Sequence, residues 1–348
     1  MSRGEIQVSV VLPTRDRWTL AEDALHSALG QQGVSVEVCV VDDGSLTPAP
    51  PGFGDDPRVR LFRHDRSQGV ASSRNRAIHA ARGEWVAFLD DDDVWAPWHL
   101  QRLLRPLEGN GARWGFSGYV MTTRERKPIG NGPIPAVESD LVRQFLRTNP
   151  VGTPSCAVVE TETVRSIGGF DERMSVMADW DLWVRLAMAG RPVTSAAFTV
   201  GYAQHSGSMS LDADLVQAEW AYMAAHYKPE LERLDLTFAD NEYFWRWSAQ
   251  GCARRRRRRS AARLFLRAAL RGGGFRDIVR AIAVVPVVGW PIRLRRWIRT
   301  ALRRRQAPNS DHAWLQPFSE RASSAGSGSS PSASGISQRC RVRTRPSP

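Results

Sequence analysis

The first 120 residues alternate between two hydrophobic patterns. Continuous apolar runs, typical of strands buried on both faces, are followed by segments whose apolar residues recur at helical spacing. The strands expected are Val8–Leu12, Val34–Val41, Arg58–Arg63 and Glu84–Leu89. The helices expected are Trp18–Leu29, Gly69–Ala81 and Pro97–Leu107. Strand–helix alternation of this kind predicts an α/β fold, with a mostly parallel sheet covered by helices.

The rest of the chain divides into three stretches of different character. Residues 113–210 mix expected strands (Arg113–Tyr119, Ser155–Val159, Val193–Gln204) with expected helices (Thr161–Ile167, Asp179–Ala189). The pattern is helical from about residue 212. From residue 306 it is rich in Ser, Gly and Pro, with ten Ser among residues 319–348. We therefore expect a catalytic-type domain over 1–210, a helical, Arg-rich extension over 211–305 and a disordered tail over 306–348.

No membrane span or secretory signal is expected. The longest apolar run, Ala281–Ile292, is far shorter than the roughly 20 residues that cross a bilayer, and Pro286 and Pro291 interrupt it. The four cysteines are widely spaced and form no CxxC pair, which fits a reducing compartment. We expect a cytoplasmic protein, with peripheral attachment to the inner face of the plasma membrane as the alternative.

The net charge of +12 is unevenly distributed. Residues 251–305 hold 18 Arg and a single acidic residue, Asp277, whereas residues 1–250 hold more acidic than basic residues. The run Arg254–Arg259 is compatible with a solvated helix face or with phosphate binding. No nucleic-acid fold motif accompanies it, so a nucleic acid is disfavoured as partner. Leu, Ile and Trp residues interleave with Arg over 254–305, which suits an anionic membrane surface.

The four consecutive carboxylates Asp90–Asp93 follow a buried strand directly. Such carboxylates repel one another, and a hard divalent cation such as Mg²⁺ or Mn²⁺ is one reason to keep them together. The alternative is an exposed acidic loop before the helix that begins at Pro97. The position directly after a buried strand favours the metal site.

Two further polar segments end expected parallel strands. Pro13, Thr14 and Arg15 follow the first strand, and Asp42 and Asp43 follow the second. Taken alone, Asp-Asp-Gly-Ser is ordinary turn chemistry. Ligands of parallel α/β sheets bind at the carboxyl ends of the strands, so these segments and the acidic run are expected to line one cleft. A carboxylate there suits a base or ribose, and Arg15 suits a phosphate.

Six motifs in order resemble those of family 2 glycosyltransferases: VSVVLPTRDR, VVDDGS, GVASSRNRAI, GEWVAFLDDDDVW, GGFDE and ADWDLWVRLAMAG. The resemblance spans roughly residues 6–210 and implies the GT-A fold and an inverting reaction on nucleotide-diphosphate sugars. It implies Asp92 as the direct metal ligand, with Asp90 or Asp91 toward the ribose or the metal. It places Pro13, Arg15 and Asp43 in the nucleotide pocket. Arg74 and Asn75 are implied near the donor, Asn75 in a partly structural role.

On the acceptor side the family's acidic motif reads Ala178-Asp179-Trp180 in this chain. The first acid is absent, but the Asp that the family uses as general base is retained as Asp179. A helix N-cap is the structural alternative for Asp179, and Asp181 is the rival base. Trp180 is expected on the acceptor side. His205 is implied near the diphosphate or metal, although a lone His after a strand is more often structural.

These residues predict metal-assisted, inverting transfer of a sugar to an acceptor hydroxyl. The acceptor is expected to be a glycan, a lipid-linked sugar or a small molecule, in the context of bacterial cell-envelope polysaccharides. The alternative is an inactive nucleotide-sugar-binding protein or membrane-docked scaffold, suggested by Ala178. No GxGxxG follows the first strand, and neither a P-loop nor an HExxH motif is present, which disfavours dehydrogenases, P-loop NTPases and zincins.

Overall fold

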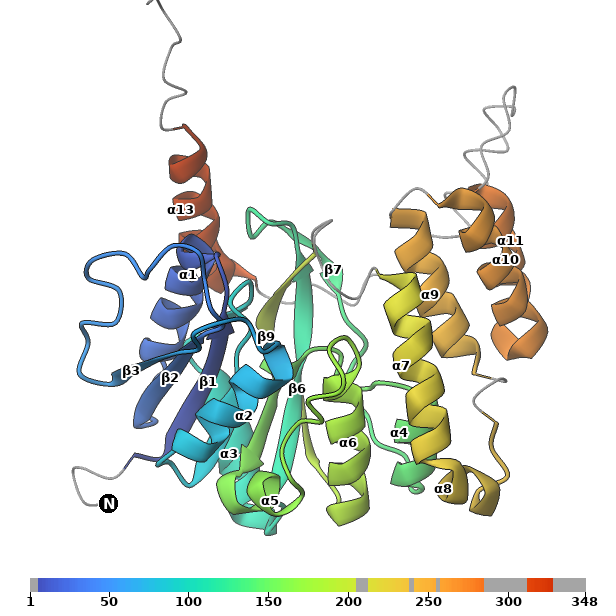
Figure 1. Cartoon of the computed structure of the whole chain (residues 1–348), viewed down its shortest axis with the longest axis horizontal. Helices are drawn as coiled ribbons and strands as arrows, with labels where there is room; N and C mark the ends of the chain where they lie inside the picture. The colour runs from blue at the N-terminus through green and yellow to red at the C-terminus, as the bar shows by residue number, and fades with distance from the viewer. Residues whose placement is uncertain (1–5, 205–211, 238–240, 255–256, 285–311, 328–348) are drawn as a thin grey trace, which may run out of the picture.

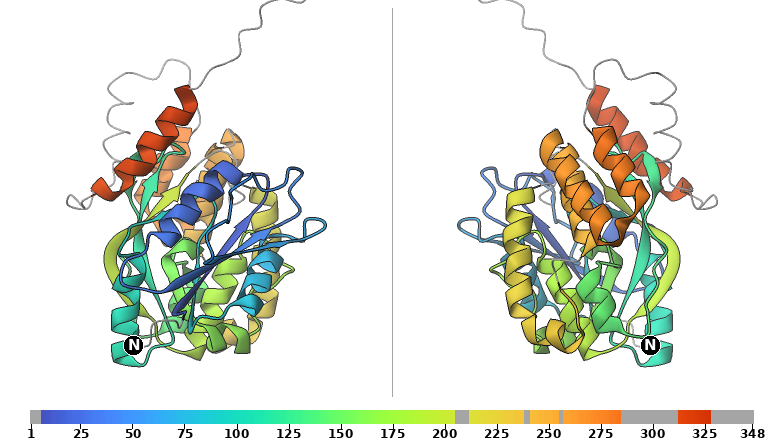
Figure 2. Two further views of the ribbon diagram at one scale, coloured as in Figure 1. Left: turned by 90° about the vertical axis from the view of Figure 1, so that its left-hand side faces the viewer. Right: turned by 90° about the vertical axis from the view of Figure 1, so that its right-hand side faces the viewer.

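The structure is a computed structural model that describes residues 6–204, 212–237, 241–254, 257–284 and 312–327. Its centre is a nine-stranded sheet with the order β3-β2-β1-β4-β8-β6-β9-β5, and β7 pairs with β6 at one side of this path (Figure 1). Helices cover both faces of the sheet (Figure 2). This is the α/β architecture that the hydrophobic pattern predicts.

The first half of the sheet is parallel, as expected. It consists of β3 (Val59–Arg63), β2 (Val36–Asp42), β1 (Val8–Thr14) and β4 (Trp85–Phe88). Every residue of β1, β2 and β4 is buried, which is why these segments read as unbroken apolar runs. Thr14 pairs with Asp42, so the residues that follow β1 and β2 emerge side by side at one edge.

The second half of the sheet is mixed. Strand β8 (Ala157–Glu160) is antiparallel to both β4 and β6 (Trp114–Thr122), whereas β9 (Val193–Ala203) is parallel to β6. Two strands were not predicted from the sequence, β5 (Val94–Trp95) and β7 (Pro128–Asn131). The sheet is therefore parallel from β3 to β4 and largely antiparallel beyond it.

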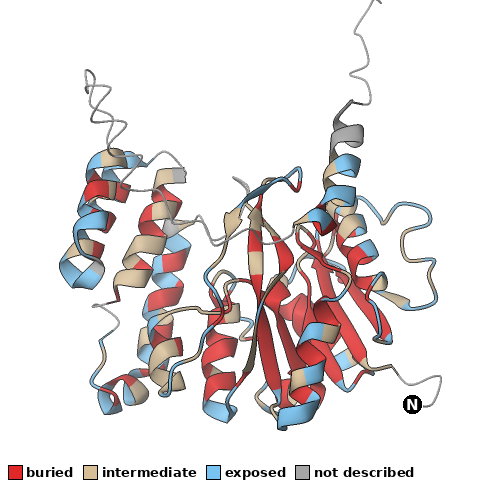
Figure 3. Cartoon of the chain, turned by 180° about the vertical axis from the view of Figure 1, so that it is seen from behind, coloured by how far each residue is buried: buried red, intermediate tan, exposed pale blue. Residues whose placement is uncertain are grey.

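Helices α1 (Trp18–Leu29) and α3 (His99–Asn110) lie on one face of the sheet. Helices α2 (Val70–Ala80) and α6 (Ala178–Ala189) lie on the other (Figure 2). The remaining short helices of this part are α5, Thr161–Ser166, α4, Leu141–Arg147, and the 3-10 turn η1, Pro154–Cys156. Figure 3 shows that strands in the middle of the sheet are buried, and every residue of β1, β2 and β4 is.

The main core continues past residue 210. Helices α7 (Ala213–His226) and α9 (Glu242–Arg254) stand beside α6, joined through α8 (Lys228–Arg233) (Figure 1). Buried side chains of these helices, among them Trp220 and Phe244, belong to the same hydrophobic cluster as the sheet. The boundary that we placed at residue 210 therefore does not coincide with the end of the core.

Beyond α9 the chain forms a smaller helical unit. Helix α10 (Arg258–Ala268), the π-helical turn η4 (Ala269–Gly273) and α11 (Phe275–Val284) pack against α9 around a separate small core. Their outward faces are exposed (Figure 3). None of the helices in the described part of the chain is long and apolar enough to cross a bilayer.

The tail that we expected to be disordered from residue 306 contains ordered structure. Residues 313–315 form the 3-10 turn η5, and Gln316–Ser327 form helix α13. Trp314 and Leu315 are buried in a cluster with Val94 of β5. The prediction of disorder is thus wrong for residues 312–327, because two apolar side chains anchor a segment whose composition is otherwise polar. Residues 306–311 and 328–348 lie outside the described residues.

Candidate active site

A cavity of about 530 Å³ opens at the carboxyl ends of β1, β2 and β4. The residues after these strands form one side, and α2 contributes Ser73 and Arg74. The start of α6, with Asp179 and Trp180, forms another part of the lining. Of the residues proposed from sequence, those lining the cavity are Pro13, Thr14, Arg15, Asp43, Arg74, Asp90, Asp91, Asp92, Asp179 and Trp180. The predicted cleft therefore exists and joins both sets of residues.

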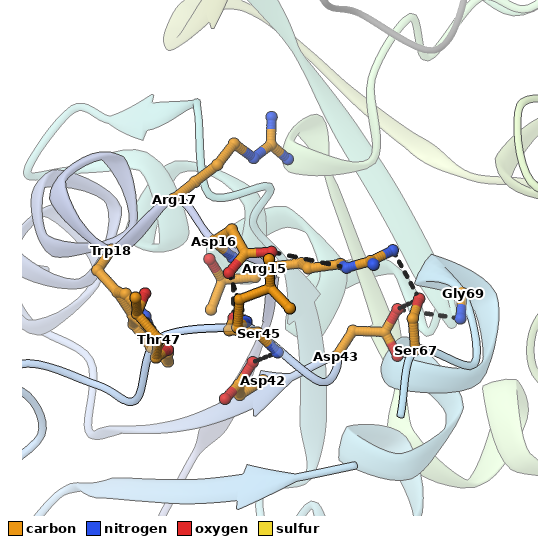
Figure 4. Close-up of polar contacts among 12 residues, drawn as sticks. Arg15, Asp16, Arg17, Trp18, Asp42, Asp43, Ser45, Thr47, Ser67 and Gly69 are labelled. Atoms are coloured by element: carbon orange, nitrogen blue, oxygen red, sulfur yellow. Dashed lines mark hydrogen bonds and ion pairs between the residues drawn. The ribbon is translucent and has the colours of Figure 1, made fainter. Parts of the chain in front are cut away.

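Asp43 is the centre of a rigid turn at the end of β2. Its carboxylate accepts the Ser67 hydroxyl at 2.6 Å and the backbone N–H groups of Gln68 and Gly69 at 2.8 and 3.0 Å (Figure 4). Burial acts to raise its pKa, but these bonds and His64 hold the pKa at about 2. Asp43 is therefore ionised at any physiological pH.

Gly44 permits this close approach. Its φ is +68°, and a Cβ atom there would lie 2.7 Å from the backbone of Arg66 and Ser67. Any other residue would push the two loops apart and pull the Ser67 segment away from Asp43. An ordinary turn was our alternative to a binding role for the Asp-Asp-Gly-Ser segment. In the structure this turn also forms part of the cavity wall.

Two arginines extend from the loop after β1 in different directions. Arg15 reaches across to Ser67, 3.0 Å from its hydroxyl oxygen, and lies beside Asp43 (Figure 4). Arg17 turns away from this group and bridges two carboxylates, Asp91 at 2.6 Å and Asp92 at 3.0 Å. Arg15 and Arg17 both line the cavity, so this end carries positive charge suited to phosphate groups.

The four consecutive carboxylates have different environments. Asp93 is fully buried, accepts hydrogen bonds from Thr153 and Ser155, and has a pKa raised well above its usual range by burial. Asp91 is also buried, and burial raises its pKa to about 7 although Arg17 opposes the shift. Asp90 and Asp92 are partly exposed at the cavity. The run is therefore not a solvated acidic loop.

Arg74 connects the acidic run to the other side of the cavity. Its guanidinium pairs with Asp90 at 2.5 Å and lies 5.0 Å from the centre of the Phe170 ring. Arg74 is 5% exposed, and its Nε atom has no hydrogen-bond partner among the described residues. The same holds for the hydroxyl of Ser73, which is fully buried beside it. Unpaired buried polar atoms at a cavity wall indicate a polar ligand.

Asp179 lies in the first turn of α6, not at its N-cap, which is Met177. The N-cap role that we weighed for Asp179 is therefore wrong. Its Oδ1 atom accepts the backbone N–H of Trp180 at 2.8 Å. Burial raises the pKa of Asp179 to about 6, and the positive charge of Arg74 limits that rise. A carboxyl group titrating this near neutrality is suited to proton transfer.

The segment before α6 is held by a residue far along the chain. Glu219 of α7, itself buried, accepts the backbone N–H groups of Ser175, Val176 and Met177 at 2.8, 2.9 and 2.8 Å. These three residues line the cavity. Glu219 therefore fixes the loop that leads into Asp179.

An aromatic wall closes the Asp179 side of the cavity. It consists of Trp180 of α6 with Tyr243 and Trp247 of α9. The ring centres of Tyr243 and Trp247 lie 5.7 and 6.3 Å from that of Trp180. The term aromatic wall denotes these three residues below.

Three described residues that were proposed from sequence, Asp42, Asn75 and Asp181, do not line the cavity. Asp42 stabilises its turn by accepting the Ser45 N–H at 2.8 Å, and Asp181 pairs with Arg185 and accepts the Tyr227 hydroxyl at 2.6 Å. Asn75 holds the loop at Phe170 with bonds of 2.8 and 2.9 Å. These are structural roles, so Asp179 rather than Asp181 faces the cavity. His205 lies outside the described residues.

Several lining residues were not proposed from sequence. Arg17 stands within the PTRDR motif, and the pair Tyr243 and Trp247 shows the i, i+4 spacing of one helix face. That spacing is the sequence signal from which Tyr243 and Trp247 could have been proposed. Tertiary structure brings in the others from loops and from α2, η1 and β9: Ser67, Gly69, Val70, Ser73, Asn149, Gly152, Thr153, Pro154, Ser175, Val176, Met177, Tyr202 and Ala203.

The carboxylates of the cavity fit a metal site in which the protein supplies only some of the ligands. Within the described ranges no group of three or more His, Cys, Asp or Glu side chains converges to hold an ion. Asp90 and Asp92 both line the cavity. Mg²⁺ is typically bound through one or two carboxylates, with phosphate oxygens and water as the other ligands. The donor set of this cavity is compatible with that arrangement.

Residues 9–166 match the family model described as "Glycosyl transferase family 2". These residues, slightly less than half of the chain, form a glycosyl transferase family 2 domain. The match begins in β1 and ends in α5, so it includes the strand ends that form the polar side of the cavity. Asp179 and the aromatic wall lie beyond the matched family 2 segment.

Among the proteins similar to this chain are two curated relatives and one solved structure. The succinoglycan biosynthesis protein ExoO of Rhizobium meliloti is 49% identical over 92 residues, 26% of each chain. The putative teichuronic acid biosynthesis glycosyltransferase TuaG of Bacillus subtilis is 30% identical over 126 residues, 35% of this chain and 50% of TuaG. S. aureus TarS 1–349 in complex with UDP-GlcNAc is 16% identical, with a TM-score of 0.49 over 92% of each chain. The chain thus spans only part of the length of these curated relatives.

Proposed function

We propose that this protein transfers a sugar from a nucleotide-diphosphate donor to a hydroxyl group of a cell-envelope polysaccharide or its precursor, with inversion at the anomeric carbon. The observation that carries the proposal is the placement of Asp179, with a pKa of about 6, in one cavity with Asp90, Asp92 and three arginines. The family 2 match and the relatives named for succinoglycan and teichuronic acid biosynthesis support it.

The polar side of the cavity suits the donor. Arg15, Arg17 and Arg74 provide guanidinium groups for a diphosphate, and Asp43 is an ionised acceptor for hydroxyl or base N–H groups. The Ser73 hydroxyl and Arg74 Nε are buried there without a partner among the described residues. A bound diphospho-sugar would supply hydrogen-bond partners for both.

Asp90 and Asp92 are the residues that would hold a divalent cation. When bound, Mg²⁺ or Mn²⁺ would stabilise the negative charge of the leaving diphosphate as a Lewis acid. Both carboxylates are paired with arginines in the structure, Asp90 with Arg74 and Asp92 with Arg17. These arginines orient the two carboxylates at the cavity wall.

Asp179 would act as the general base. Its carboxylate takes the proton of the acceptor hydroxyl, and the hydroxyl oxygen bonds to the anomeric carbon on the face opposite the diphosphate. The bond from that carbon to the diphosphate oxygen breaks, and the nucleoside diphosphate leaves with the electron pair. This single displacement inverts the anomeric carbon and needs no covalent enzyme intermediate.

The inactive-scaffold alternative is not favoured by the structure. It was suggested by Ala178, which stands where the family has an acid. Ala178 is fully buried, whereas Asp179 lines the cavity and has the perturbed pKa expected of an active group.

The activity is tested with a panel of nucleotide-diphospho-sugars, Mn²⁺ or Mg²⁺, and saccharide acceptors. Release of nucleoside diphosphate is followed by chromatography, and the anomeric configuration of the product by proton NMR. We expect acceptor-dependent release with inversion. A panel in which no nucleotide-sugar binds or reacts, or a product with retained configuration, contradicts the proposal.

We also propose that the α10–η4–α11 unit docks on an anionic membrane. Five large apolar side chains are exposed there, by 40 to 85%: Leu266, Leu270, Phe275, Ile278 and Ile282. Exposed arginines surround them, and the acidic residue of this unit, Asp277, is buried between Arg246 and Arg280. Apolar side chains flanked by arginines match the interface of an anionic bilayer.

Membrane docking is tested by co-sedimentation with vesicles of phosphatidylglycerol and phosphatidylcholine. Leu270→Asp is expected to reduce binding, because it places a negative charge on the most exposed apolar position of the unit. Leu46→Asp is the matched control, since Leu46 is 90% exposed in a distant loop. Equal vesicle binding by both variants and the wild type, or no binding by any of them, overturns the docking proposal.

A further inference from the structure

We propose that the aromatic wall is an acceptor subsite that binds a neutral sugar ring, not a lipid chain. The inference rests on the proposed transferase function and names the chemistry of the group that presents its hydroxyl to Asp179. It concerns the part of the cavity formed by α6 and α9, which lies outside the family 2 match.

The wall lies directly beside the proposed base. Trp180 follows Asp179 in the first turn of α6, and both line the cavity. Tyr243 and Trp247 are four residues apart on α9 and therefore project from the same face of that helix. Tyr243 and Trp247 are partly exposed, whereas Trp180 is 2% exposed and packs beside them. An acceptor whose hydroxyl approaches Asp179 would thus lie against the rings of Tyr243 and Trp247.

The wall is held in a fixed geometry. The indole Nε1 of Trp180 donates to the carbonyl oxygen of Phe145 at 2.6 Å, which fixes the ring orientation. Trp220 lies 5.3 Å from Trp180 and stacks on Phe244 with ring centres 4.0 Å apart. A rigid aromatic surface binds a rigid ring at low entropic cost, whereas a flexible prenyl chain would lose more freedom there.

Polar groups around the wall fit sugar hydroxyls. Asn149 and Ser175 line the cavity close to Asp179, together with the three rings. The basic residues among the described lining positions are Arg15 and Arg17, which follow β1, and Arg74 of α2, which pairs with Asp90. Apart from Asp179, the proposed base, the wall therefore offers apolar rings with the uncharged polar neighbours Asn149 and Ser175. This combination matches a pyranose, which has C–H faces and a hydroxyl rim.

The test is saturation-transfer NMR on the full chain with nucleoside diphosphate and Mg²⁺ present. The sugar probes are methyl glycosides of neutral hexoses and N-acetylhexosamines, and the lipid probe is farnesyl phosphate. Three variants are compared: Trp247→Phe, which keeps an aromatic face, Trp247→Leu, which keeps only an apolar one, and the control Trp98→Leu. Trp98 is 36% exposed at the start of α3 and does not line the cavity.

We expect sugar probes to receive saturation on their ring-face protons in the wild type, Trp98→Leu and Trp247→Phe. In Trp247→Leu the sugar affinity should fall about tenfold, the value of one aromatic contact, while nucleoside diphosphate affinity stays within about twofold. Sugar binding that survives Trp247→Leu unchanged overturns the inference. So does a wall that binds farnesyl phosphate but no sugar probe while the nucleotide still binds. Failure of every nucleoside diphosphate to bind instead overturns the proposed function.

Discussion

Glu219 and Met177 are joined by a hydrogen bond of 2.8 Å, from the Met177 backbone N–H to the Glu219 carboxylate. Met177 is the N-cap residue of α6, and Asp179 lies two residues later. Glu219 comes from α7, which follows the region of clear family resemblance. The orientation of the proposed base thus depends on a helix that the sequence motifs do not include.

Replacing Glu219 with Gln should lower both stability and turnover. The Gln side chain has one oxygen that can accept hydrogen bonds and one N–H₂ group that cannot. Three backbone N–H groups donate to the two carboxylate oxygens of Glu219, which is itself buried, so at least one of them loses its acceptor. We expect a loss of about 1–3 kcal/mol in the free energy of unfolding and a larger fall in kcat than in donor affinity. Denaturant unfolding and steady-state kinetics measure both. Glu22→Gln, at an exposed position of α1, is the control and should leave both values unchanged.

The rate should rise with pH through the titration of Asp179. Burial raises the pKa of this carboxyl to about 6, so below that pH it is protonated and takes no proton from the acceptor. The profile of kcat/KM is expected to climb to a plateau above about pH 7, with a midpoint near 6. A profile that is flat from about pH 5 to pH 8 is incompatible with Asp179 as the base.

Asp179→Asn should stabilise the fold at neutral pH. The folded-state pKa is raised above the unfolded value, so the wild type loses stability as pH rises from about 4 to about 6. The amide carries no charge to desolvate, and the variant should gain about 1–3 kcal/mol in the free energy of unfolding at pH 8. The gain should vanish at about pH 4. Thermal unfolding at the two pH values measures it, and an equal effect at both would contradict the assignment of the pKa.

Leu315→Ala should destabilise the domain although it lies in the Ser-rich tail. Leu315 is 1% exposed and packs against β5 and β9, where a Cβ added at Gly201 would lie 2.8 Å from Leu315 Cδ2. Truncation leaves a cavity behind the Asp90–Asp93 loop, at a cost of about 2–4 kcal/mol. Leu46→Ala, at a 90% exposed site, is the matched control. Identical melting of the two variants would mean that the tail is not anchored there.

Helices and strands with a local hydrophobic pattern could be predicted from the sequence. Strands such as Val8–Thr14 are buried along their whole length, so their apolar runs identify them. By contrast, β5 has two residues, too few for any period, and it exists because it pairs with β9 about a hundred residues later. Helix α13 was missed for a related reason: the contacts of Trp314 and Leu315 with β5 and β9 are tertiary and leave no local signal.

The residues of the candidate site also form two groups, those that the sequence could place and those whose position depends on tertiary contacts. Its polar side follows parallel strands directly, so Arg15, Asp43 and Asp90 could be placed from strand order alone. Residues such as Asp42 and Asp181 have the same side chain and similar sequence context, yet they point into hydrogen-bond networks away from the cavity. Side-chain direction after a strand end or within a helix turn depends on neighbours that only the folded chain supplies.

The most direct test of the account is the rate of sugar transfer by Asp179→Asn under conditions in which the wild type turns over. The variant keeps the shape of the side chain but takes up no proton. We predict a loss of about 10² to 10⁴-fold in kcat, with donor binding retained in a calorimetric titration. Transfer at the wild-type rate by Asp179→Asn would contradict the assignment of Asp179 as the general base.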